Sequence, residues 1–151
     1  MPTKSKPKKT RRRSSIAVQC AVGGAPSAAL LRHFALAAAP ARAEVTLRVV
    51  GAREAKALNK KFRRKTHSTN VLSFSYGSGS GDVVLCHPVI AREAKQQGKS
   101  LRAHYAHLVV HGVLHLRGHD HLRGRDAARM EGAEIRVLRR LGYDDPYAVR
   151  R

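Results

Sequence analysis

The spacing of hydrophobic residues changes several times along this chain, and each change predicts an element of secondary structure. Where apolar and polar residues alternate, as in residues 45–49, we expect a β-strand with one buried face. This pattern, or a short apolar run, predicts strands at residues 16–22, 45–49, 71–74 and 82–86. Apolar residues three or four apart predict helices at residues 27–39, 52–62, 88–97, 101–117 and 125–141.

Glycine, proline and serine mark the boundaries between these elements. Pro88 can begin a helix and Gly98 can end it, and Ser100 is a suitable N-cap for the next helix. The Gly-Ser-Gly-Ser-Gly run at residues 77–81 predicts a loose, flexible connection between strands three and four, which we expect to form a hairpin. Because strands and helices are intermixed and no repeat is visible, the pattern predicts one α+β domain with a small sheet covered by helices.

The helical spacing also predicts which side chains are buried. In the last helix we expect Ala128, Ile135 and Leu138 to face the core. Met130 is assigned to ordinary core packing, because a methionine inside a helix usually fills gaps. His107 in the preceding helix is expected to be buried and hydrogen-bonded, although its position also suits the lining of a cleft.

Positive charge dominates the composition. The 151 residues include 30 Lys and Arg against 10 Asp and Glu, which gives a net charge of +20 and a pI near 11.3. Such an excess predicts a polyanionic partner, RNA or DNA, or an acidic membrane surface. Residues 1–13 are nearly devoid of apolar side chains and predict a disordered basic tail before a domain at residues 14–151. The tail is either an electrostatic arm for RNA or a solvated segment without function.

Two observations bear on location. The only cysteines, Cys20 and Cys86, are far apart and form no metal or disulfide motif, which favours a reducing compartment. A basic start followed by small and apolar residues up to residue 43 resembles a secretory signal, but polar residues and Pro26 interrupt its apolar part. No stretch approaches the ~20 apolar residues of a membrane span. We therefore expect a cytoplasmic protein without a membrane partner.

Histidines in residues 111–121 predict a metal site on a helix and the turn after it. His111 and His115 are four residues apart, so they lie on one face of a helix and can bind one ion together. Gly118 can adopt the left-handed conformation that ends helices, which would bring His121 to the same ion. Three neutral nitrogen ligands suit Zn²⁺ and leave a coordination position for water, as in catalytic sites.

The same histidine spacing occurs in metzincin proteases, which carry a glutamate general base directly after the first histidine. Here that position is Gly112, so the pattern favours a metal and disfavours a standard protease. A helix that carries histidines without any metal remains the simpler alternative.

Several ordered motifs, taken together, resemble the YbeY family of metal-dependent bacterial endoribonucleases. The segment His-Gly-Val-Leu-His-Leu-Arg-Gly-His-Asp-His at residues 111–121 matches the family signature, with His119 in place of tyrosine. Further matching motifs follow the family order at residues 58–59, 62–63, 69–74, 81–82, 130–131, 141–143 and 146–147. The resemblance covers residues 14–147 and implies a single α+β domain with a mixed sheet of about four strands.

The resemblance also implies a function. It identifies His111, His115 and His121 as ligands of one Zn²⁺ per chain, and Arg63 as a catalytic arginine of the cleft. The implied activity is cleavage of single-stranded ribosomal RNA in 16S rRNA 3′ end maturation and ribosome quality control, with the small ribosomal subunit as a partner. The alternative is a non-catalytic ribosome-assembly or RNA-binding factor in which the metal is structural.

Basic residues around Arg63 suit the expected substrate. A guanidinium group binds phosphate in a planar fork, so Arg63 can stabilise charge on the scissile phosphate. Lys60, Lys61, Arg64 and Lys65 are expected to hold the flanking RNA backbone. Without the family resemblance, a solvated basic loop would be the preferred interpretation of these residues.

Overall fold

A computed structural model describes residues 13–63, 69–118 and 124–148. Four strands form one mixed sheet in the order β1-β2-β4-β3. The strands are β1 (Ser15–Cys20), β2 (Glu44–Val50), β3 (Val71–Gly77) and β4 (Ser80–Cys86). The pairs β1–β2 and β2–β4 are parallel and β3–β4 is antiparallel. The expected α+β domain with a small mixed sheet is therefore confirmed.

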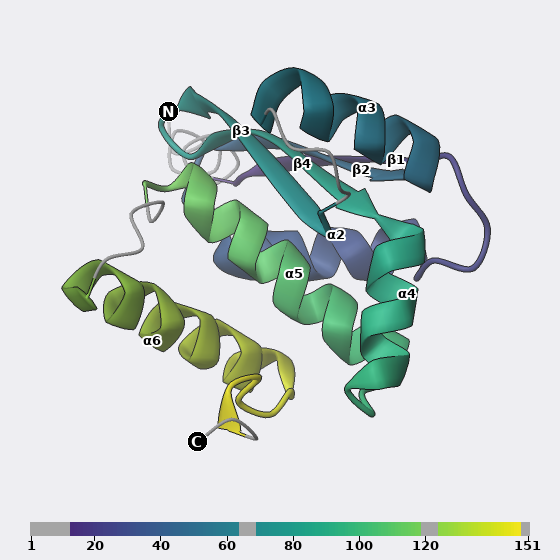
Figure 1. Ribbon diagram of the computed structural model, residues 1–151. Helices are drawn as coiled ribbons and strands as arrows, with labels where there is room; N and C mark the ends of the chain where they lie inside the picture. Colours follow the sequence, from purple (N-terminus) through teal and green to yellow (C-terminus); the bar gives the residue numbers. More distant parts are fainter. Residues whose placement is uncertain (1–12, 64–68, 119–123, 149–151) are drawn as a thin grey trace.

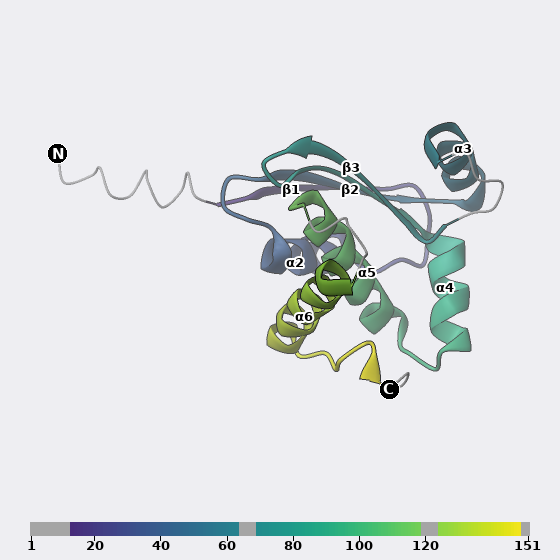
Figure 2. The ribbon, with the colours of Figure 1, turned by 60° about the vertical axis from the view of Figure 1, so that its left-hand side comes forward.

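Helices cover the two faces of the sheet unequally. The helices are α2 (Ala28–Ala38), α3 (Ala52–Arg63), α4 (His87–Gln96), α5 (Leu101–Leu116) and α6 (Gly124–Leu141). Figure 2 shows α2, α5 and α6 on one side of the sheet and α3 on the other. In Figure 1, α5 runs diagonally across the sheet, with α6 packed on its outer side. No helix in the described part of the chain is long and apolar enough to cross a membrane.

Alternating side chains of the strands divide the core into two clusters. Leu47, Val49 and Leu85 belong to the large cluster between the sheet and the helices α2, α5 and α6. Leu72 and Val84 point to the opposite face, where a smaller cluster lies under α3. This is the two-residue period of a sheet that is covered on both sides.

The hairpin between β3 and β4 corrects one prediction. Residues 77–81 are not a loose connection, because the strands stay paired up to Gly77 and Ser80. The two residues between them, Ser78 and Gly79, have φ values of 55° and 80°. A tight two-residue hairpin turn requires positive φ at both central positions, and glycine adopts it without strain. The glycines and serines thus form a tight turn that resembles a flexible linker in composition only.

The central helix α5 begins and ends as expected. The hydroxyl of Ser100 accepts a hydrogen bond from the backbone N–H of Ala103 at 3.0 Å, so Ser100 is the N-cap. Gly118 has a φ of 97°, the left-handed conformation that was predicted to end the helix. Tyr105, Val109 and Val113 are completely buried. Because α5 packs against the sheet, α2, α4 and α6, its residues 103–116 are buried except for positions 103, 107, 111 and 115.

The buried face of α6 differs from the predicted one. Ala128 is exposed and Ile135 is only half-buried, whereas Leu138 is buried as expected. Met130 is in the core, which confirms its assignment. The buried stripe also includes Glu134, which is 0% exposed. Compared with the prediction, α6 is rotated about its axis, so that the carboxylate of Glu134 faces α5 and Ala128 does not.

Candidate metal centre

A row of histidines lies along one side of α5, where His107, His111 and His115 are partly exposed and His104 is buried. His104, His107, His111 and His115 follow one another at intervals of three or four residues, which places them on one side of the helix. The ring centroids of successive pairs are 6.3, 6.2 and 4.5 Å apart. The rings therefore come closest together at the C-terminal end of the row.

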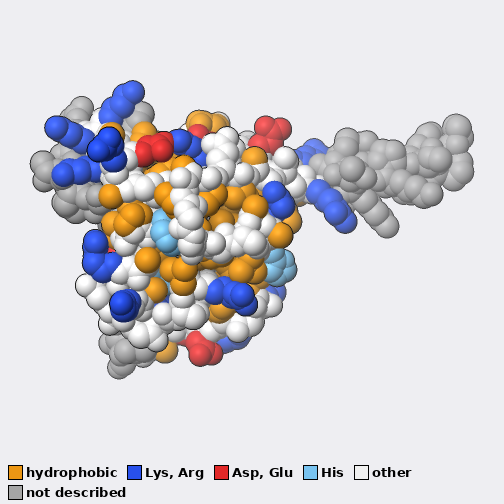
Figure 3. Space-filling model, turned by 90° about the vertical axis from the view of Figure 1, so that its right-hand side faces the viewer, with side chains coloured by type: hydrophobic (Ala, Val, Ile, Leu, Met, Phe, Trp, Pro, Cys, Tyr) orange, Lys and Arg blue, Asp and Glu red, His pale blue; other side chains and the backbone are white. Residues whose placement is uncertain are grey.

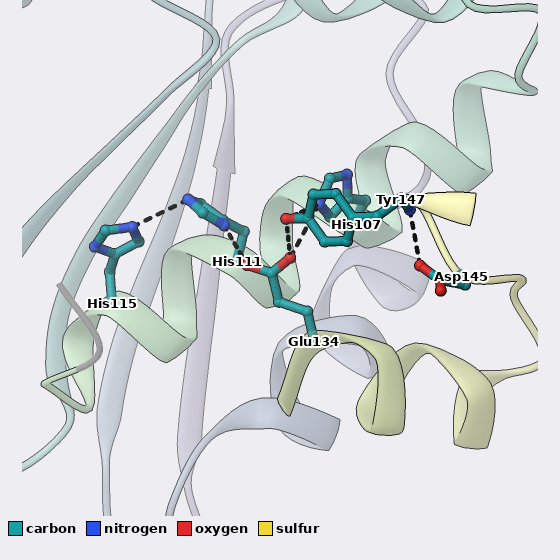
Figure 4. A network of polar contacts seen from close by, with 6 residues as sticks. All are labelled: His107, His111, His115, Glu134, Asp145 and Tyr147. Atoms are coloured by element: carbon teal, nitrogen blue, oxygen red, sulfur yellow. Dashed lines mark hydrogen bonds and ion pairs between the residues drawn. The ribbon is translucent and has the colours of Figure 1, made fainter. Parts of the chain in front are cut away.

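His111 and His115 present a pair of nitrogens to each other. Their Nε2 atoms are 3.0 Å apart, as the dashed line between them in Figure 4 marks. Two nitrogens of a tetrahedral Zn²⁺ site lie about 3.3 Å apart, given Zn–N bonds near 2.05 Å. The helix thus brings two of the three predicted ligands into a position that suits one ion. The third predicted ligand, His121, lies outside the described residues.

A buried carboxylate that the sequence analysis missed supports this pair. Glu134 Oε2 accepts a hydrogen bond from Nδ1 of His111. Its other oxygen, Oε1, accepts from Nε2 of His107 at 3.2 Å and from the hydroxyl of Tyr147. Burial raises the pKa of Glu134, but the hydrogen bonds from His107, His111 and Tyr147 outweigh it and hold this pKa at about 2. Glu134 is therefore a carboxylate that three donors stabilise.

Two features of the sequence point to Glu134 in retrospect. It lies four residues after Met130 and four before Leu138, so it belongs to the apolar stripe of α6. A charged residue in a buried stripe requires a partner, and the histidines of α5 supply it. The prediction that His107 is hydrogen-bonded is confirmed. Its side chain is 14% exposed, so it is not completely buried.

A second group of potential ligands shares His111. Ligand atoms of His107, His111 and Glu134 lie within 4.8 Å of one another, which also suits a metal ion. This group is less accessible, because the side chain of Glu134 is 0% exposed while that of His111 is 25% exposed. The donor set, two or more imidazoles with a carboxylate close by, is one that Zn²⁺ and similar divalent ions accept. The geometry therefore fits a metal, and it leaves two possible positions for it.

The position after His111 has no room for a side chain. A Cβ atom at Gly112 would lie 2.7 Å from Cγ1 of Val83 and 3.2 Å from Oγ of Ser73. The hydroxyl of Ser73 also donates a hydrogen bond to the carbonyl of Gly112 at 3.0 Å. Residue 112 is thus a close contact of α5 with the sheet, which excludes the glutamate that a metzincin carries there.

The predicted RNA-binding residues lie on or after α3. Lys60 and Lys61 are exposed on this helix, which covers the face of the sheet opposite to α5. Arg63 is the last residue of α3, and nothing is described of its side chain. Arg64 and Lys65 lie outside the described residues, as does Asp120 beside the third predicted ligand. The roles of these basic residues in RNA binding and of Arg63 in catalysis therefore stay predictions.

The fold and the site together define a class, namely small α+β proteins with a candidate metal centre on a buried helix. Comparison with known proteins narrows the class. The family described as Endoribonuclease YbeY matches residues 27–142. The chain is 50% identical to the Endoribonuclease YbeY of Aromatoleum aromaticum over 144 residues, which cover 90% of this chain and 94% of that protein. It is 51% identical to the corresponding protein of Nitrosomonas eutropha over 127 residues, 82% of this chain and 90% of that one.

The chain therefore belongs to the YbeY endoribonuclease family. Among solved structures, the solution structure of TM1509 from Thermotoga maritima has the same fold, with a TM-score of 0.57 and 20% identity over 84% of this chain and 91% of that one. The predicted resemblance is thus confirmed.

Proposed function

We propose that this protein is a metal-dependent endoribonuclease that cleaves single-stranded ribosomal RNA in the cytoplasm. Its proposed tasks are 16S rRNA 3′ end maturation and ribosome quality control. The observation that carries this proposal is the pair of Nε2 atoms of His111 and His115, 3.0 Å apart, in a chain about half identical to proteins named Endoribonuclease YbeY.

The proposed metal is one Zn²⁺ per chain, with His111, His115 and His121 as its ligands. When bound, such an ion supplies a Lewis acid for a phosphate oxygen and makes water a stronger nucleophile. The chain supplies access to the site and a fixed position for the histidines. The His111 side chain is 25% exposed, so the site is open to a substrate, and the contact of α5 with the sheet at Gly112 keeps the helix in place.

The proposed substrate is held by charge. The chain carries +20 overall, and Figure 3 shows Lys and Arg side chains spread over one face of the molecule. Phosphate contacts from Lys60, Lys61, Arg64 and Lys65 would bind the RNA backbone, and Arg63 would stabilise the charge that the scissile phosphate gains. Within the proposed domain at residues 14–151, these groups are the RNA-binding part. For the basic residues 1–13, an electrostatic arm on RNA and a solvated segment without function both stay open.

The experiment that tests this function is cleavage of a single-stranded ribosomal RNA fragment by the purified chain with its metal content measured. We expect about one zinc per chain, cleavage by the parent, and loss of both in His115→Ala. Arg63→Ala is expected to keep the metal and lose most of the cleavage, because it removes only the phosphate contact.

Two results would contradict the proposal. If the parent binds zinc and RNA but cuts neither free RNA nor small-subunit particles, the protein is an assembly factor with a structural metal. If an Arg63→Ala protein cleaves at the parental rate, the role assigned to Arg63 is wrong.

A further inference from the structure

We infer that Glu134 is a positioning residue of the metal centre, which holds His111 in the tautomer that carries its proton on Nδ1 and therefore presents Nε2 to a metal beside His115. This inference rests on the proposed function, because it assumes that the histidine pair binds a metal. Glu134 itself touches neither the metal nor the substrate.

The hydrogen bonds of Glu134 fix the position of the proton on His111. An ionised carboxylate can only accept, so the contact from Nδ1 of His111 to Oε2 places the imidazole proton on Nδ1. A neutral imidazole with a proton on Nδ1 has its lone pair on Nε2, the atom that faces His115. Histidine ligands in metal sites are commonly oriented by a carboxylate on their second nitrogen in this way.

Glu134 also cannot easily turn away from His111. Its other oxygen is fixed by Nε2 of His107 on α5 and by the hydroxyl of Tyr147 in the C-terminal segment. The backbone N–H of Tyr147 donates to Asp145 at 2.8 Å, which holds that segment in a turn. In Figure 4, dashed lines join the carboxylate of Glu134 to His111 on one side and to His107 and Tyr147 on the other. Three parts of the chain thus set the orientation of one carboxylate.

Burial separates a positioning role from a ligand role. Both oxygens of Glu134 already accept hydrogen bonds, and its side chain is 0% exposed. A metal placed among His107, His111 and Glu134 would have to displace these contacts inside the core. A metal placed between the Nε2 atoms of His111 and His115 keeps every one of them.

A matched control exists on the same helix. Glu93 Oε1 and Nε2 of His104 form a second carboxylate–histidine pair at 2.9 Å. His104 precedes His111 by seven residues, or about 10 Å along an α-helix, so this pair cannot orient His111. Glu93→Gln therefore makes the same chemical change as Glu134→Gln outside the proposed centre.

The experiment measures zinc affinity and the His111 tautomer in the full chain. Affinity is determined by competition with a chromophoric chelator for the parent, Glu134→Gln, Tyr147→Phe and Glu93→Gln. The tautomer is determined in metal-free protein by long-range ¹H–¹⁵N NMR of ¹⁵N-histidine, with the His111 signals assigned by their loss in His111→Gln. The second readout does not depend on activity or on metal.

We expect the parent to show His111 protonated on Nδ1. Glu134→Gln is expected to bind zinc about 10–100-fold more weakly at unchanged stoichiometry, the range typical for loss of an outer contact, and to show both tautomers. Tyr147→Phe removes one hydrogen bond to Glu134 and keeps its carboxylate, so a smaller loss in the same direction is expected. Glu93→Gln is expected to bind as the parent does.

Four results would overturn the inference. The first is a His111 proton on Nε2 in the parent, the second is parental zinc affinity in Glu134→Gln, and the third is an equal loss of affinity in Glu93→Gln. The fourth is loss of the bound zinc at saturation in Glu134→Gln, which would make Glu134 a ligand. If the parent binds no zinc, the metal-dependent function fails. The tautomers of the parent and of Glu134→Gln then still decide whether Glu134 orients His111.

Discussion

The two halves of α5 carry the same kind of polar pair with opposite exposure. In the N-terminal half, the side chain of His104 is 4% exposed and its partner Glu93 is 28% exposed. In the C-terminal half the relation is reversed, since Glu134 is 0% exposed and His111 is 25% exposed. The first pair turns a carboxylate toward solvent, and the second turns an imidazole toward it.

The surroundings explain this difference. Glu93 Oε1 also accepts from Nδ2 of Asn70 at 3.0 Å, so the first pair joins α4, α5 and the residue before β3. The second pair lies beside His115, whose ring centroid is 4.5 Å from that of His111. A carboxylate–histidine pair is therefore a structural link in one half of the helix and the support of a candidate metal centre in the other. What decides between these roles is which partner reaches the surface.

The two halves of α5 are expected to differ most at the predicted metal ligands. His115→Ala removes one of two facing nitrogens, so we expect metal affinity to fall by more than about 100-fold, beyond the range for outer contacts. His104→Ala is expected to keep the parental metal affinity and to lower the free energy of unfolding by about 1–3 kcal/mol, because it truncates a buried hydrogen-bonded side chain. Metal content and urea unfolding of both variants give the check. Loss of metal in His104→Ala would erase the distinction between the two halves.

The contact of the C-terminal half with the sheet gives the second test. Gly112→Ala would place a Cβ 2.7 Å from Cγ1 of Val83, and we expect this overpacking to cost about 1–3 kcal/mol of unfolding free energy. Gly132→Ala in α6 is the matched variant, because its nearest neighbour is the flexible end of the Arg136 side chain at 3.5 Å. It is expected to stabilise the protein by about 0.5–1 kcal/mol, the difference in helix propensity. Thermal unfolding measures both, and equal signs would refute the assigned packing.

The third test asks whether RNA binding extends beyond the metal centre to α3, on the opposite face of the sheet. We expect a double variant, Lys60→Gln with Lys61→Gln, to bind single-stranded RNA more weakly. The salt slope of log affinity is expected to fall by about one for each phosphate that these lysines bind in the parent. The metal content of the variant is expected to equal that of the parent. Anisotropy titrations at several salt concentrations measure the slope, and an unchanged slope would remove both lysines from the RNA-binding set.

The smallest expected effect is the pH dependence of the N-terminal pair. Burial lowers the pKa of His104, although the hydrogen bond to Glu93 raises it in part. The folded chain therefore binds this proton less readily than the unfolded chain, whose histidines titrate near about 6.5. The contribution of His104 to the free energy of unfolding is thus fully present above this pH and is lost as the pH falls below it. Urea unfolding of metal-free protein at several pH values measures the loss.

Two variants test whether this pH dependence of stability comes from His104. His104→Gln is expected to show a weaker pH dependence than the parent, because it lacks the titrating group. His33→Gln, on the exposed side of α2, is the control and is expected to match the parent. Identical curves for the parent and His104→Gln would assign the dependence to other groups.

Much of the fold could be predicted because its signals are local. The alternation in β2, the N-cap Ser100 and the left-handed Gly118 each depend on a few neighbouring residues, and the structure has them as predicted. The spacing of His111 and His115 is likewise a property of one helix. These features follow from the period of a single element.

The remaining features depend on how elements meet. Glu134, and not Ala128, is on the buried side of α6, because histidines on α5 donate hydrogen bonds to its carboxylate. The predicted stripe was chosen from apolar residues alone, so it passed over Glu134, although Glu134 shares the helical spacing of Met130 and Leu138. The turn at Ser78 and Gly79 was misjudged for a similar reason, since its composition suits a linker and only the pairing of β3 with β4 makes it tight.

The measurement that tests the account most directly is the position of the metal in crystals grown with Zn²⁺, located by anomalous diffraction at the zinc edge. The account predicts a peak bonded to the Nε2 atoms of His111 and His115 at about 2.0–2.1 Å, with Glu134 still accepting from Nδ1 of His111. A peak among His107, Glu134 and Nδ1 of His111 would contradict it.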